Sequence, residues 1–141
     1  MKPVKFVVDA SVALKWFIPE EYSDASLLLL KNAYPLFAPD LIFSELGNVL
    51  WKKTRNRDID KRVANTIINA FLEFPIKIYS SALLMISAYE LAEKFNSTVY
   101  DCMYLACAIT EECPLVTADK RFFNEIKKST FQKNIRFVDQ I

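Results

Sequence analysis

The sequence predicts an α/β protein with a mainly parallel sheet. Short β-rich runs alternate with longer helical segments from one end of the chain to the other, and this alternation is typical of parallel strands joined by helices. The chain has a single glycine, Gly47, so it should be rich in helix and have few turns that need a positive φ. Its 141 residues, 52% of them hydrophobic and 25% charged, predict one globular domain over residues 1–141.

The first half of the chain predicts two strands and four helices. The run Val4 to Val8 is a buried strand, and Leu36 to Ala38, between Pro35 and Pro39, is a very short second strand. Helical spacing of apolar residues and proline stops place the helices. The predicted helices span residues 11–17, 23–31, 40–55 and 58–74, and either Asp58 or Asp60 should cap the last one.

The second half of the chain continues the alternation. Ile76 to Tyr79 is a strand, and Ser80 or Ser81 should cap the helix that follows and reaches about Phe95. Residues 96–98 are a loop. An apolar helix over 101–111, a strand over 114–117, a helix over 119–128 and a last strand over 135–138 complete the predicted order of elements.

Several classes of function are excluded by what the sequence lacks. Without histidine, the chain has neither a Ser-His-Asp triad nor a histidine general base. With one glycine it cannot build a Gly-rich phosphate loop or a dinucleotide fingerprint. Three cysteines in a chain with no credible signal peptide and no membrane-spanning segment predict a cytoplasmic protein with reduced thiols. The net charge of +1 predicts no particular partner.

Four acidic residues interrupt apolar segments. Asp9 ends the first strand, Glu45 lies on the apolar stripe of the helix over 40–55, Asp101 opens an apolar helix and Asp119 follows a strand. Isolated carboxylates are costly to bury. Because ligand sites in parallel sheets lie at the carboxyl ends of strands, Asp9 and Asp119 should face one crevice if their strands are neighbours.

Four carboxylates in one crevice would repel one another. Two carboxylates about 5 Å apart repel by roughly 3 kcal/mol at an effective dielectric of about 20, so some must be protonated or a divalent ion must neutralise them. A set of oxygen ligands with room for water suits Mg²⁺ or Mn²⁺. One or two such ions can orient a phosphodiester and activate water.

A simpler interpretation exists for most of these residues. Asp9, Asp101 and Asp119 could each serve a helix N-terminus, whereas Glu45 lies in the middle of its helix. Ser11 and Thr117, each two residues from an acid, could orient a carboxylate or bond to turn backbone. Asn48, one helical turn after Glu45, is either a supporting residue of the site or an exposed amide.

These motifs, taken in order, resemble the PIN-domain family. The matching stretches are Val7-Val8-Asp9-Ala10-Ser11, Pro39-Asp40-Leu41 through Glu45, Thr98-Val99-Tyr100-Asp101 and Leu115 through Phe122. Within that family the sequence most resembles VapC-type toxins of toxin–antitoxin pairs, and the resemblance spans nearly the whole chain. The position two after Asp9 is Ser11 rather than a second aspartate, which fits a haloacid-dehalogenase phosphatase poorly.

The resemblance implies a fold, an activity and a set of site residues. Its fold would be a three-layer α/β/α sandwich, and its activity that of a Mg²⁺- or Mn²⁺-dependent endoribonuclease that forms a homodimer and is inhibited by a small antitoxin. Asp9, Glu45, Asp101 and Asp119 fall on the family's acidic quartet, and Ser11 and Thr117 on its hydroxyl positions. The alternatives are a PIN nuclease of RNA processing or DNA maintenance without an antitoxin, and a non-catalytic α/β binding module.

Contacts to RNA and to an antitoxin can also be placed on the sequence. Residues 51–62 carry six basic residues against two aspartates, an excess that could hold phosphates beside an acidic site. Trp51 or Tyr22 could stack a base. An antitoxin could bind near Trp16, Phe17, the stretch 27–30 and Trp51. The candidate RNA contacts are Lys15, Lys52, Lys53, Arg55, Arg57, Lys120 and Arg121.

Overall fold

Five parallel strands form the centre of the protein in the computed structural model, which describes residues 3–141. The strands are β1 (Phe6–Val8), β2 (Leu36–Pro39), β3 (Ile76–Tyr79), β4 (Leu115–Thr117) and β5 (Ile135–Phe137). Their order in the sheet is β3-β2-β1-β4-β5, and every pair of neighbours is parallel. The prediction of a parallel sheet is confirmed.

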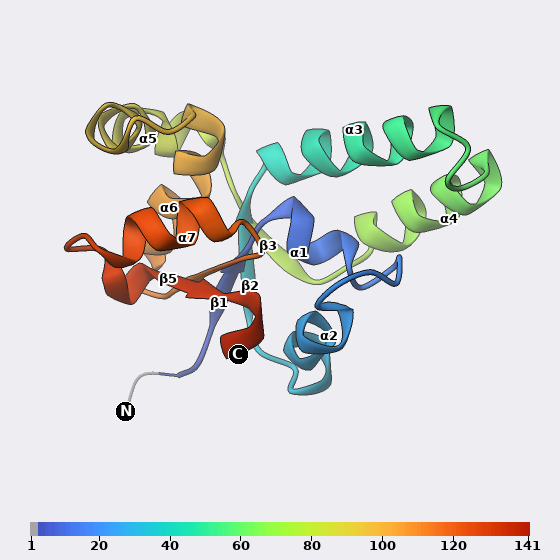
Figure 1. Ribbon diagram of the computed structural model, residues 1–141, viewed down its shortest axis with the longest axis horizontal. Helices are drawn as coiled ribbons and strands as arrows, with labels where there is room; N and C mark the ends of the chain where they lie inside the picture. The colour runs from blue at the N-terminus through green and yellow to red at the C-terminus, as the bar shows by residue number, and fades with distance from the viewer. Residues whose placement is uncertain (1–2) are drawn as a thin grey trace.

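Helices cover both faces of this sheet. They are α1 (Ala10–Leu14), α2 (Ser23–Lys31), α3 (Leu41–Arg55), α4 (Lys61–Leu72), α5 (Ser81–Phe95), α6 (Val99–Glu111) and α7 (Lys120–Lys127), with short 3₁₀ turns η1 (Gln132–Asn134) and η2 (Val138–Gln140). Helices α1 to α4 lie on one side of the sheet and α5 to α7 on the other (Figure 1). The fold is a three-layer α/β/α sandwich.

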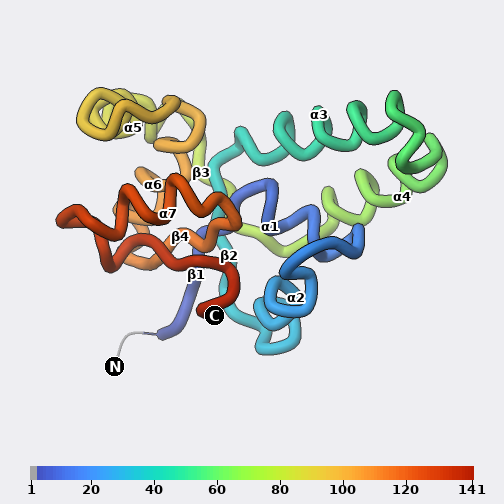
Figure 2. The backbone as a smooth tube through the Cα atoms, in the orientation of Figure 1, coloured from blue at the N-terminus to red at the C-terminus, as the bar shows by residue number. Residues whose placement is uncertain are grey.

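Two helix pairs give the molecule its shape. Helix α6 packs against β1, β2 and β4, and α5 packs on the outside of α6. Helices α3 and α4 run side by side as an arm that reaches away from the sheet, at the right of Figure 2. The buried residues of all three layers form one continuous hydrophobic core.

Strand β1 is shorter than the sequence predicts. It begins at Phe6, and Val4, which the predicted strand included, is 55% exposed. Phe6, Val7 and Val8 are buried, as expected for a strand covered on both faces. The apolar run therefore identified the strand but not the residue at which the chain enters the core.

Side-chain caps set the helix ends that the sequence misplaced. Helix α6 begins at Val99 rather than Asp101, because the Thr98 hydroxyl accepts the Asp101 backbone N–H at 3.1 Å. Helix α4 begins at Lys61, where Asp60 caps it, as one of the two predicted alternatives had it. Helix α1 begins one residue earlier than predicted, and regular α-helix ends at Leu14 before the chain continues in turns to Phe17.

The three cysteines behave as the sequence predicts. Cys102, Cys107 and Cys113 are free and buried, and burial raises the pKa of Cys107 to about 12. They are therefore packing residues rather than reactive thiols. In the part of the chain that the structure describes, no helix is long and apolar enough to cross a membrane.

The order of the strands creates the site. The chain moves from β1 outward to β2 and β3, and then returns across the sheet to β4 on the other side of β1. The neighbours β1 and β4 therefore form a topological switch point, where helices leave toward opposite faces and open a crevice. Asp9 follows β1 directly, and Asp119 follows β4 after one residue.

Candidate active site

A pocket of about 420 Å³ lies at this switch point and brings the four predicted acids together. Each acid comes from a different part of the fold: Asp9 from the end of β1, Glu45 from α3, Asp101 from α6 and Asp119 from the start of α7. The remaining residues of the pocket wall are Ala10, Ser11, Leu14, Glu20, Asn48, Val49, Lys52, Tyr104, Leu115, Thr117 and Phe122.

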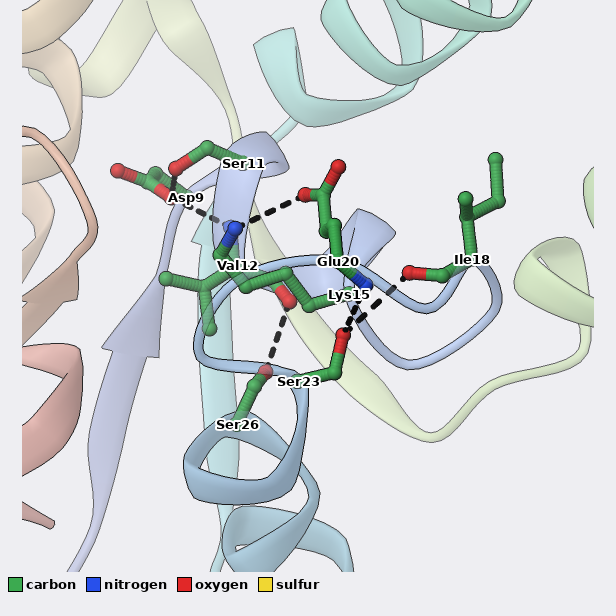
Figure 3. A network of polar contacts seen from close by, with 8 residues as sticks. All are labelled: Asp9, Ser11, Val12, Lys15, Ile18, Glu20, Ser23 and Ser26. Carbon is green, nitrogen blue, oxygen red and sulfur yellow. Dashed lines mark hydrogen bonds and ion pairs between the residues drawn. The ribbon is translucent and has the colours of Figure 1, made fainter. Parts of the chain in front are cut away.

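Asp9 is held by hydrogen bonds to its own helix. Its Oδ1 accepts the Ser11 hydroxyl at 2.6 Å and the Val12 backbone N–H at 2.9 Å, so Asp9 is the N-cap of α1 (Figure 3). Burial raises the pKa of Asp9, and the charge of Glu45 adds to this, whereas hydrogen bonds from Ser11, Val12 and Thr117 oppose it. Asp9 is thus both the cap of α1 and a residue of the pocket.

Glu45 is held by a tyrosine. It is half-buried on α3, and its Oε1 accepts the Tyr104 hydroxyl at 2.6 Å. Burial, and next the hydrogen bond to Glu45, raise the pKa of Tyr104, so this hydroxyl keeps its proton and acts as a donor at neutral pH. The prediction that a mid-helix Glu on an apolar stripe belongs to a site agrees with this placement.

Asp101 and Asp119 line the pocket together, and the charge of Asp119 acts on Asp101. Asp119 caps α7, its Oδ1 accepting the Phe122 backbone N–H at 3.1 Å. Asp101 lies in the first turn of α6, where Thr98 is the cap. Burial raises the pKa of Asp101, the charge of Asp119 raises it further, and the Thr98 hydroxyl opposes the rise. Asp101 is therefore not the N-cap of its helix.

The three supporting residues that the sequence indicated also line the pocket. Ser11 donates to Asp9. The buried Thr117 contributes a hydroxyl that accepts the Asp119 backbone N–H at 3.1 Å and favours ionisation of Asp9. Asn48 is exposed on α3 at the pocket wall. The Thr117 hydroxyl therefore connects the ends of β4 and β1.

The basic candidates separate into three groups. Lys52 lines the main pocket, and Arg121 lines a smaller hollow of about 150 Å³ that shares Asp101 and Asp119 with it. Lys120 follows Asp119 in the chain, and its ammonium lies over the Phe137 ring, 5.8 Å from the ring centre. Farther along the α3–α4 arm, outside the pocket, are Lys53, Arg55 and Arg57.

Lys15 is already paired with an acidic side chain. Its side chain is buried, and its ammonium contacts Glu20 Oε1 at 2.9 Å (Figure 3). Contact with an RNA phosphate would require breaking this ion pair, and the role of Lys15 as an RNA contact stays a prediction. The turn that carries Glu20 back to Lys15 gave no signal in the sequence.

Two pocket residues with polar side chains were missed by the sequence reasoning. Glu20 follows Pro19 in a loop and gave no periodic signal. Tyr104 lies three residues after Asp101, which places both on one face of α6. That spacing was a usable signal, but within an apolar helix a tyrosine was indistinguishable from a core residue.

The donor set suits a hard divalent cation. Four carboxylates supply oxygen ligands only, and the pocket volume leaves room for water, which Mg²⁺ and Mn²⁺ prefer to keep. Within residues 3–141, no three acidic or cysteine side chains are close enough to count as a preformed metal cluster. The residues present fit such an ion by chemistry and by their shared pocket.

Comparison with known proteins gives the family. Residues 6–128 match the model of the PIN domain, and the chain belongs to the PIN-domain family. It is 33% identical over 120 residues to Ribonuclease VapC3 of Pyrobaculum aerophilum, an alignment that covers 84% of this chain and 92% of that protein.

Solved structures share the fold. A crystal structure of a Pyrobaculum aerophilum protein superposes with a TM-score of 0.73 at 24% identity, covering 96% of this chain and 85% of the other. VapBC2 of Rickettsia felis, bound to promoter DNA, gives 0.67 at 16% identity, with 95% and 98% covered. The Mycobacterium tuberculosis toxin VapC20, which cleaves the sarcin–ricin loop, gives 0.66 at 16% identity, with 84% and 92% covered.

The raised pKa of Asp101 predicts a pH-dependent stability. A carboxyl with a higher pKa in the folded than in the unfolded protein binds its proton more tightly when folded. Stability is therefore lost as the pH rises from the ordinary value of 3.8 through the raised value. In the presence of a chelator, Asp101→Asn should unfold at a higher temperature than the wild type at pH 7.5, and the difference should shrink toward pH 4.

Calorimetric unfolding at both pH values measures this effect. Asp139→Asn, at an exposed residue outside the pocket, is the control and should leave the unfolding temperature unchanged. An Asp101→Asn variant no more stable than the wild type at pH 7.5 would contradict the raised pKa of Asp101.

Proposed function

We propose that this protein is an endoribonuclease that hydrolyses RNA phosphodiester bonds with one or two Mg²⁺ or Mn²⁺ ions, and that it is the toxin of a type II toxin–antitoxin pair. The main observation that supports the proposal is that one pocket is lined by Asp9, Glu45, Asp101 and Asp119. Membership of the PIN-domain family and the 33% identity to a VapC ribonuclease support it.

The chain's own residues divide the work. The four carboxylates would hold the cation, which when bound supplies positive charge that activates water and stabilises the charge developing on the phosphodiester. Ser11 and Thr117 fix Asp9, and backbone N–H groups engage Asp9 and Asp119. Within residues 3–141, no backbone N–H donates to the carboxylates of Glu45 and Asp101, and these two are the candidates to take the proton from the attacking water.

The RNA would approach between two basic walls. Lys52 stands on the α3 side of the carboxylates and Arg121 on the α7 side. Beyond Lys52 the arm is basic, and its exposed Trp51 carries the Arg55 guanidinium over its ring, 5.5 Å from the ring centre. Positive charge on both sides offsets the repulsion between RNA and the acidic pocket, and Trp51 offers a surface for stacking a base.

An antitoxin segment would bind a groove beside α4. This groove of about 390 Å³ is lined by Phe17 together with Arg62, Val63, Thr66, Ile67 and Ala70. An apolar side chain would fill it and an acidic residue would pair with Arg62. Of the other residues suggested by the sequence, Trp16 instead stacks on Phe74 at 5.1 Å and donates to the Ser26 carbonyl. Protease protection of α4 unchanged by the antitoxin would argue against this groove.

A second copy of the chain would cover α5. No charged residue occurs in this helix before Glu90, and Leu83 and Ile86 are each 77% exposed, beside the exposed Met85 and Tyr89. An apolar surface of this kind is typical of a homodimer interface. Sedimentation of the wild type as a monomer at micromolar concentration would rule the dimer out.

The central test is loss of cleavage on removing charge from the quartet. Asp9→Asn and Asp101→Asn should each slow Mg²⁺-dependent RNA cleavage by at least about 100-fold, because several kcal/mol of transition-state stabilisation is lost. The measurement is cleavage-site mapping on total RNA, with circular dichroism to confirm folding. Asp139→Asn should cleave as the wild type does, and undiminished cleavage by both pocket variants would refute the assignment.

The positive charges of Lys52 and Arg121 predict that neutralising either residue weakens RNA binding and makes it less dependent on salt. In the Asp101→Asn background, which should not cleave, Lys52→Gln or Arg121→Gln should weaken binding to single-stranded RNA. Each should lower the slope of log K against log salt by about 0.7, the value for one lost phosphate contact. Lys133→Gln, at an exposed residue of η1, should change neither quantity. Equal effects of all three substitutions would show that binding follows net charge alone.

A further inference from the structure

A buried tyrosine stands behind the acidic pocket. Tyr104 is 3% exposed, and it lies on α6 one turn after Asp101. Its hydroxyl reaches the pocket wall and donates to Glu45 Oε1 at 2.6 Å. The Tyr104 hydroxyl oxygen also accepts a hydrogen bond from the backbone N–H of Ala10, the residue after Asp9. One hydroxyl therefore connects the elements that carry three of the four acids.

Glu45 needs such a partner more than the other acids do. The aspartates have short side chains, and backbone N–H groups at helix N-termini hold two of them, Asp9 and Asp119. Glu45 has a longer side chain in the middle of α3, where helical backbone N–H groups are already paired. Within residues 3–141, the Tyr104 hydroxyl is the one hydrogen-bond donor to its carboxylate. Without this bond the carboxylate would sample several rotamers and face the pocket only part of the time.

We propose that Tyr104 is a positioning residue, which fixes the Glu45 carboxylate toward the other acids and thereby sets the affinity of the pocket for a divalent cation. This inference rests on the proposed function, since it assigns a role toward the same cation. Tyr104 acts through Glu45 and touches neither substrate nor scissile bond. Partners that orient metal-binding side chains typically change metal affinity 10- to 100-fold when removed.

Tyr104→Phe is the direct test, because it removes one oxygen and keeps the ring in the core. Tyr79→Phe is the matched control: its hydroxyl also donates to a glutamate, Glu111, but outside the pocket. Isothermal titration with Mn²⁺ should show binding weakened about 10- to 100-fold in Tyr104→Phe and unchanged in Tyr79→Phe. Wild-type affinity in a folded Tyr104→Phe variant would overturn the proposal.

A measurement on the wild-type protein does not depend on how the variants fold. With tyrosine labelled by ¹³C at Cζ, addition of Mg²⁺ should shift the Tyr104 signal, because the carboxylate that accepts its hydrogen bond gains a cation, and should leave the Tyr79 signal in place. A stationary Tyr104 signal while calorimetry shows Mg²⁺ binding would overturn the positioning role alone. Absence of any Mg²⁺ or Mn²⁺ binding to the wild type would instead overturn the proposed function.

Discussion

Repulsion between like charges is the constraint around which this protein is built. Four carboxylates face one pocket, and two such groups at about 5 Å repel by roughly 3 kcal/mol even at an effective dielectric of about 20. Burial is the main cause of the raised pKa values of Asp9 and Asp101, and the charges of Glu45 and Asp119 add to the rise. A single domain has only about 5–15 kcal/mol of net stability, so the repulsion must be offset by a rigid support. The buried parallel sheet and the apolar helix α6 provide it.

Secondary structure and site are made from the same residues. Asp9 and Asp119 cap α1 and α7, and their helices begin where the carboxyl ends of β1 and β4 meet. Capping fixes each carboxylate close to its backbone through Oδ1, and both residues also line the pocket. The two interpretations of these aspartates, as helix caps and as site residues, are therefore compatible. Glu45 lacks a cap position, and Tyr104 takes over the same task from another helix.

The sequence predicted the parts of the structure that follow local rules. Apolar runs located the strands, helical spacing located the helices, and acids placed in apolar surroundings located the pocket. The starts of α6 and α4, which follow the caps Thr98 and Asp60, depended on which of several polar residues bonds to the backbone. Spacing alone does not decide that. The burial of Lys15 and the approach of Glu20 depended on a turn with no periodic signal. The role of Tyr104 depended on a contact between residues 59 positions apart, which only the packed fold brings together.

The central claim is that the four carboxylates form one site for a divalent cation, and diffraction from crystals containing Mn²⁺ tests it most directly. Anomalous scattering from manganese locates the ion without reference to any activity. The account predicts a strong anomalous peak in the pocket within bonding distance of carboxylate oxygens from the set Asp9, Glu45, Asp101 and Asp119. A pocket without a peak at saturating Mn²⁺, or manganese bound only elsewhere on the surface, would contradict it.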